Sequence, residues 1–180
     1  MTGIIFIEFI KIVKTNFGTE IFEAMTKAAD DNALFIKTES YSHQRLFNLI
    51  NALSKLTHIA SEDLLALTGQ QVFLPLLLSL PIKMGSINNT IDFIIHVETY
   101  IHHEAQKLYP NATMPTFDFI FISSNQLIMD YISPRCLGYI CFGLLKGCAE
   151  YFQEKINITL QLMNESGSHV RFNLTKIELP

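Results

Sequence analysis

The first part of the chain carries apolar residues at helical spacing. Between Ile4 and Phe17 they recur every three or four positions, and across Ser42–Leu56 they gather on one side of a helix. Gly18 is expected to end the first of these helices, because glycine readily adopts the backbone conformation of a helix C-terminus. Thr19–Ala29 then predicts a second, shorter helix.

The middle of the chain continues in helical pattern but contains stronger breaks. Ser61–Asp63 is a good helix N-terminus, since a hydroxyl followed by acidic residues satisfies free backbone N–H groups. Pro75 is expected to break or kink the helix that follows. Thr90 can cap a helix over Ile91–Leu108, and Tyr109–Asn111 contains a proline that ends it.

The last third of the chain changes character. Phe117–Ile122 and Leu127–Tyr131 read as strands around a turn, and Cys136–Phe152 reads as a helix. Ile156–Met163 and Val170–Leu179 predict a hairpin. Helices first and an antiparallel sheet later indicate the α+β class, with a helical N-terminal part packed against a C-terminal sheet and helices.

Composition narrows the class of protein. With 180 residues, 49% apolar and 17% charged, the chain suits one folded domain and excludes disorder. The net charge of −4 argues against the basic surface that a nucleic acid would need. The three cysteines, an odd number, argue against a disulfide framework. The apolar N-terminus lacks a basic start and contains Glu8, so it does not resemble a signal peptide, and we expect a cytoplasmic protein.

His102 is the first candidate for chemistry. On a helix it projects from a largely apolar face, which it shares with Ile91, Ile95, Ala105 and Tyr109. An imidazole in such a place is often a core histidine bonded to a carbonyl. The alternative is a metal ligand, and spacing alone leaves both interpretations open.

Tyr131, Ser133 and Arg135 are the second candidate. In an extended segment they fall on one side of the chain. Two hydroxyls and a guanidinium there form a donor array that suits paired carboxylates. The alternative is a surface strand with a polar face.

These motifs together resemble the H-NOX (haem–nitric oxide/oxygen binding) family, the haem domains of bacterial gas sensors and of the soluble guanylate cyclase β subunit. The resemblance covers essentially the whole chain, 1–180, as one domain. It rests on Met1-Thr-Gly-Ile-Ile-Phe6, on His102 followed by Tyr109-Pro, on Tyr131-Ile-Ser133-Pro-Arg135, and on Gly143-Leu-Leu-Lys-Gly147. It implies the H-NOX fold, with a helical subregion over about 1–60 and a haem-binding α/β subregion over about 61–180.

The resemblance also implies roles for particular residues. His102 would be the axial ligand of the iron in haem b, Tyr131, Ser133 and Arg135 would hold the propionates, and Pro115 would pack against the ring. The distal pocket would be formed by apolar residues, each of which could equally be plain core: Ile5, Phe9, Leu74, Leu78, Ile140 and Leu144.

The implied function is a haem-based sensor, not an enzyme. Ile140 and Leu74 offer no hydrogen-bond donor, so the ferrous protein is expected to bind NO and CO and to form no stable O₂ complex. NO is expected to weaken the bond between His102 and iron and so to shift the helical part against the sheet. The signal would then pass to a separate protein, by family analogy a histidine kinase or a diguanylate cyclase/phosphodiesterase. Neither a nucleic acid nor a membrane is expected as a partner.

Other functions remain as alternatives, and one feature of the sequence differs from the family pattern. A haem enzyme, either peroxidase-like or NO-consuming, a haem carrier and a haem-free scaffold are the rival functions. Some family members have a Cys/His zinc site near the C-terminus. Here residues 160–171 contain no cysteine and only His169 as a candidate ligand, so no structural zinc is predicted.

Overall fold

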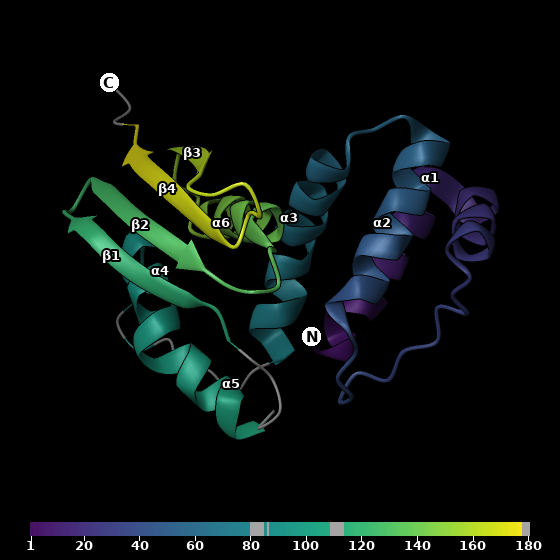
Figure 1. Ribbon diagram of the computed structural model, residues 1–180. Coiled ribbons are helices and arrows are strands. Elements are labelled where there is room, and N and C mark those ends of the chain that lie inside the picture. The colour runs from purple at the N-terminus through teal and green to yellow at the C-terminus, as the bar shows by residue number, and fades with distance from the viewer. Residues whose placement is uncertain (80–84, 86, 109–113, 178–180) are drawn as a thin grey trace.

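The chain joins a group of helices to an antiparallel sheet, which confirms the α+β class (Figure 1). The computed structural model describes residues 1–79, 85, 87–108 and 114–177. Three helices form the N-terminal part: α1 (Gly3–Ala29), α2 (His43–Thr57) and α3 (Ser61–Ser79). In Figure 1, α1 and α2 lie on one side of α3, and the sheet lies on the other.

The sheet is built from the two predicted hairpins. Its strands are β1 (Thr116–Ile122), β2 (Gln126–Ile132), β3 (Ile156–Leu162) and β4 (His169–Lys176), in the order β1-β2-β4-β3 with every pair antiparallel. The two central strands, β2 and β4, alternate between buried and more exposed side chains, so one face of the sheet packs onto the core. Tyr131, on β2, belongs to that buried face.

Helix α6 (Gly138–Tyr151) packs directly against α3, with glycines where the two backbones meet. A Cβ atom on Gly69 of α3 would lie 2.1 Å from the carbonyl oxygen of Ile140, and one on Gly143 of α6 would lie 2.0 Å from that of Ala66. Neither position has room for any side chain. The close contact between α3 and α6 therefore determines which residues of each helix face the interior.

The segment that carries His102 is more irregular than predicted. It consists of α4 (Thr90–His96), a π-helical turn (Val97–Ile101) and α5 (His102–Leu108). The cap of α4 is Asn89, whose side chain accepts a hydrogen bond from the backbone N–H of Asp92 at 2.9 Å. The prediction of Thr90 as the cap was thus wrong by one residue, and the π-turn was not predicted.

Two other expected breaks have different outcomes. Gly18 has φ 87° and ψ 168°, so the helical backbone is interrupted there, as its position predicted. Pro75 does not end α3, which continues to Ser79. Proline removes a single backbone donor, and the turns of α3 that precede Pro75 are anchored by buried residues, Val72 and Phe73 among them.

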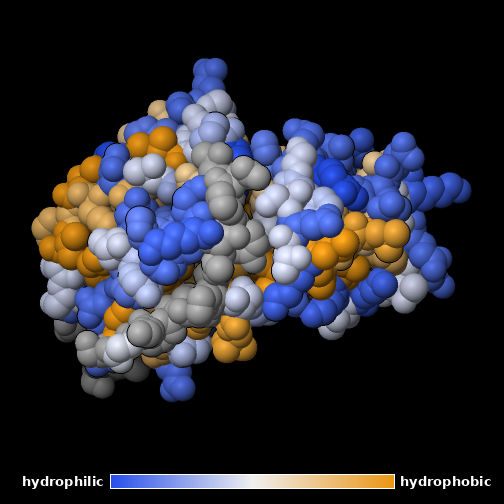
Figure 2. Space-filling model, turned by 90° about the horizontal axis from the view of Figure 1, so that it is seen from below, coloured by the Kyte–Doolittle hydropathy of each residue, from blue (hydrophilic) through white to orange (hydrophobic). Residues whose placement is uncertain are grey.

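The surface seen from below mixes both kinds of residue. Hydrophilic side chains separate the apolar patches on this face (Figure 2). Within the described part of the chain, none of the helices is both long and apolar enough to cross a membrane.

Candidate functional site

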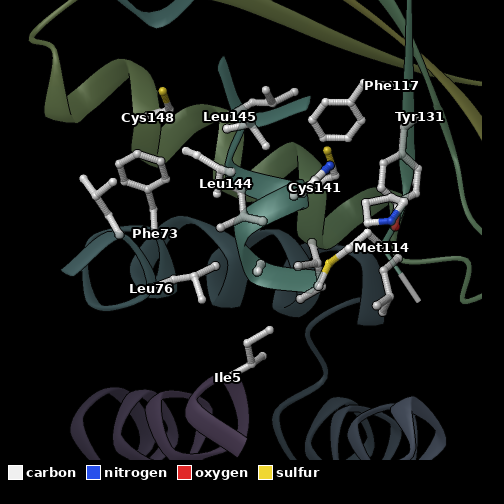
Figure 3. A pocket seen from close by; sticks show the side chains of 18 of the residues that line it. Ile5, Phe73, Leu76, Met114, Phe117, Tyr131, Cys141, Leu144, Leu145 and Cys148 are labelled. Carbon is white, nitrogen blue, oxygen red and sulfur yellow. The ribbon is translucent and has the colours of Figure 1, made fainter. Parts of the chain in front are cut away.

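An apolar cavity of about 240 Å³ lies among α1, α3, α6, β2 and the segment that carries His102. Figure 3 shows side chains from these elements around it, with Tyr131, Phe117 and Met114 toward one end and Phe73 and Cys148 toward the other. Among the described lining residues there is no Asp or Glu, and His102 is the one imidazole. The cavity therefore suits a large apolar ligand that is contacted by a few polar groups.

His102 lines the cavity with its imidazole held in a defined state. Its Nδ1 lies 2.9 Å from Oε2 of Glu98, one turn earlier. Because a carboxylate can only accept, Nδ1 carries the proton and Nε2 keeps a free electron pair. Burial lowers the pKa of His102, although the hydrogen bond to Glu98 opposes this shift. The ring is consequently neutral at pH 7, which is the state that binds a metal.

Arg135 reaches the cavity from a turn, not from the extended segment that the sequence predicted. Strand β2 ends at Ile132, and the backbone N–H of Cys136 donates to the carbonyl of Ser133 at 3.2 Å. Pro134 occupies the second position of this β-turn, which favours its fixed φ. The hydroxyl of Ser133 accepts from the backbone N–H of Arg135 at 3.3 Å. The expected side-by-side strand positions are thus replaced by a strand end and a turn.

The polar groups at this end of the cavity are incompletely satisfied. Nε of Arg135 is buried and has no hydrogen-bond partner within the part of the chain that the structure describes. Tyr131 is 3% exposed, and burial raises the pKa of its hydroxyl to about 12, so it remains a neutral donor. Tyr131 and Arg135 both line the cavity, whereas buried Ser133 supports the turn. A buried guanidinium nitrogen without a partner suits an anionic group of a ligand.

Pro115 lines the cavity together with Met114 and Phe117. The ring of Phe117 contacts His102 edge to face, with centroids 5.1 Å apart, and lies 6.1 Å from the ring of Tyr131. Phe117 thus links the histidine to the polar end. The Tyr109-Pro motif lies outside the described residues.

The expected distal residues divide into two groups. Ile5, Ile140 and Leu144 line the cavity. Phe9 does not; it is 1% exposed within the core that α1 forms with α2. That outcome corresponds to the plain-core alternative.

Leu74 and Leu78 are the main correction at the site. They are 46% and 76% exposed and do not line the cavity. The cavity side of α3 instead carries Phe73, Leu76 and Leu77. Neighbouring side chains on a helix diverge by about 100°, so an assignment shifted by one residue turns a side chain from the cavity to the solvent.

The contact between Glu98 and His102 was not predicted from the sequence. A signal was present, because Glu98 precedes His102 by four residues on one predicted helix. The π-turn between them could not be read from the hydrophobic pattern. Its apolar residues satisfy a regular helix equally well.

His169, the one candidate zinc ligand near the C-terminus, is engaged elsewhere. Its Nε2 lies 2.9 Å from Oδ2 of Asp130, and Arg171 makes two hydrogen bonds to the same carboxylate at 2.7 and 2.8 Å. The hydrogen bond from Arg171 holds the pKa of Asp130 below its usual value. This cluster stabilises the pairing of β2 with β4.

Comparison with known proteins agrees with this site. A family model described as haem-NO-binding matches residues 2–160. The unliganded Fe(II) H-NOX protein from K. algicida is 29% identical, with a TM-score of 0.91 and coverage of 99% of this chain and 98% of that one. The IWP-051-bound H-NOX from Shewanella woodyi in the Fe(II)CO state is 28% identical, with a TM-score of 0.81 and coverage of 98% and 95%. An H-NOX protein from S. oneidensis in the Fe(II)NO state shares the fold at 24% identity, with a TM-score of 0.87 and coverage of 99% and 100%.

Proposed function

Because this chain belongs to the haem-NO-binding family of haem-based gas sensors, we propose that it senses NO and CO through a ferrous haem b held by His102. One observation carries this proposal. A neutral imidazole, with Nε2 as its free nitrogen, lines an apolar cavity that also contains a buried, partnerless arginine nitrogen.

The residues present fit a haem. His102 would provide the axial ligand, and Tyr131 and Arg135 would bind the propionates, with Ser133 holding the turn that presents Arg135. Pro115 would pack against the ring. When bound, ferrous haem with a single imidazole supplies an open coordination position for a diatomic gas.

The wall formed by α3 and α6 supports discrimination against O₂. Phe73, Leu77, Ile140 and Leu144 present no hydrogen-bond donor to the cavity. Bound O₂ carries negative charge and needs such a donor, whereas NO and CO need it far less. The hydroxyl of Ser79, at the same wall, already donates to the carbonyl of Leu76 at 2.7 Å.

The thiols on this wall do not change that conclusion. Cys141 and Cys148 are weak donors, and burial raises the pKa of both, so they remain uncharged thiols. The lining residues that the structure describes also provide no carboxylate for proton transfer. Sensing is therefore favoured over peroxidase-like chemistry.

The test is a set of absorption spectra of the ferrous protein, purified with its haem, under argon, CO, NO and air. We expect distinct NO and CO complexes and no persistent O₂ complex. A stable oxy spectrum in air would refute the selectivity.

The role of His102 is tested with a neighbouring control. A His102→Gly variant should lose the five-coordinate spectrum and regain it with added imidazole. His103→Gly removes an adjacent, exposed histidine and should behave as the wild type. Equal spectra for wild type and His102→Gly would overturn the proposal.

The output of the sensor would be a change in a separate partner, proposed from the family as a histidine kinase or a diguanylate cyclase/phosphodiesterase. A regulatory effect requires that the partner bind the unliganded and NO-bound states differently. Partner activity measured with the ferrous protein before and after NO addition tests this. Identical activity with both states would exclude regulation of that partner.

A further inference from the structure

The π-helical turn Val97–Ile101 ends directly at the histidine. The backbone N–H of His102 donates to the carbonyl of Val97, five residues earlier. Turns of this kind are rare and occur frequently at functional sites. This π-turn lies directly before His102, the candidate axial ligand of the iron.

The turn brings a carboxylate to the far nitrogen of that ligand. Residues four apart on a helix lie on the same face, about one turn from each other. Glu98 and His102 are four apart, and their Oε2 and Nδ1 atoms are 2.9 Å apart. Their side chains are 27% and 18% exposed, so the contact is only partly open to water. On the other side, the edge contact with Phe117 limits rotation of the ring.

We propose that Glu98, in the π-turn one turn before His102, is the positioning residue of His102. A hydrogen bond from Nδ1 to a carboxylate fixes the tautomer with Nε2 unprotonated and makes Nε2 a stronger electron donor. The strength of the bond from His102 to iron is thereby set by Glu98. So is the fraction of protein in which His102 stays bonded when NO binds. This inference rests on the proposed function, and it specifies which residue sets the strength of the bond between His102 and iron.

Two substitutions separate the charge from the hydrogen bond. Glu98→Gln keeps a neutral acceptor of the same shape, and Glu98→Ala removes the acceptor altogether. Glu104→Gln is the matched control, since Glu104 lies on the same segment but pairs with Lys107 at 2.7 Å.

The first measurement is the iron–histidine stretching frequency of the ferrous, unliganded holoprotein by resonance Raman spectroscopy. It should fall from wild type to Glu98→Gln and fall further in Glu98→Ala, while Glu104→Gln remains at the wild-type value. The fraction of the NO complex that has lost His102 should rise in the same order. An unchanged frequency in both Glu98 variants would overturn the proposal.

The second measurement is independent of haem. Two-dimensional ¹H–¹⁵N NMR of the full-length chain prepared without haem, at pH 7.5, reports which imidazole nitrogen of His102 carries the proton. Wild type should have it on Nδ1, and Glu98→Ala should shift the tautomer ratio toward Nε2 about tenfold, the effect of one charge-assisted hydrogen bond.

The two measurements distinguish the possible failures. If the wild type binds no haem, the proposed function fails while the tautomer ratio still decides the role of Glu98. If Glu98→Ala does not fold, Glu98→Gln alone must shift the ratio in the same direction. A wild-type ratio in that variant would refute the inference.

Discussion

Replacing Gly143 by alanine tests whether the contact between α3 and α6 is as close as the backbone indicates. The new Cβ would lie 2.0 Å from the carbonyl oxygen of Ala66 and 2.7 Å from the backbone nitrogen of Gln70. Both are backbone atoms, so no side chain can turn away to make room. The helices would have to separate by about 1 Å before the contact became tolerable.

The direction of the stability change distinguishes a close contact between the helices from an open one. In a helix interior without a clash, alanine is more stable than glycine by about 1 kcal/mol. Overpacking of a close contact costs about 3 kcal/mol at the upper end of its usual range, so the net loss is about 2 kcal/mol. For a chain of 180 residues this lowers the melting temperature by about 4–8 °C.

Urea denaturation followed by circular dichroism measures the loss, and a graded series controls it. Gly69→Ala should match Gly143→Ala, because its Cβ would lie 2.1 Å from the carbonyl oxygen of Ile140. Gly147→Ala should cost less, since its nearest backbone atom, the carbonyl oxygen of Gln70, is 2.6 Å away. Unchanged or increased stability of Gly143→Ala would refute the reasoning.

Three other predictions concern the sheet and the cavity. Asp130→Asn should cost about 2 kcal/mol at pH 7, because Arg171 loses its charged partner. The lowered pKa of Asp130 makes its contribution complete above about pH 4 and lost as the pH falls toward the folded-state pKa. Urea titrations of both proteins should therefore converge in acid, and a constant difference would contradict this. Ile140→Tyr adds a donor to the cavity wall and should give a persistent oxy spectrum in air that the wild type lacks; a spectrum in air like that of the wild type would show that the phenol misses the ligand. Leu77→Ala should change CO binding kinetics, whereas Leu78→Ala should not, because its side chain is 76% exposed; the reverse order would restore the original assignment.

The sequence predicted the parts of the site that depend on residue type. The residues alone left a core histidine and a polar strand face as alternatives, and the resemblance to the H-NOX family selected the ligand and propionate roles. His102, Tyr131 and Arg135 accordingly line one cavity. The hairpins also followed from the sequence, since strand alternation and turn residues are local signals.

The sequence could not predict in the same way which side chains of α3 face the cavity, because this depends on the rotation of the helix about its axis. Every position from Val72 to Leu78 except Pro75 is apolar. The hydrophobic pattern therefore does not indicate which side of this part of α3 faces the interior. The phase is set by Gly69, whose missing side chain lets α3 meet α6 at one rotation only. That contact turns Phe73 and Leu77 inward and leaves Leu74 and Leu78 outside. Which side chains of α3 face the cavity is therefore determined by tertiary packing, which a local sequence pattern does not contain.

The cavity therefore combines two walls of different mechanical character. On one side, α3 and α6 approach each other through Gly69 and Gly143, so closely that a Cβ at either position would lie about 2 Å from a carbonyl oxygen of the other helix. On the other side, His102 lies at the end of a π-turn, a local departure from regular α-helical hydrogen bonding. A force applied at His102 should consequently move its own helix and not the α3–α6 wall. A sensor needs this asymmetry, because the pocket that selects the gas must keep its shape while the segment that reports binding changes.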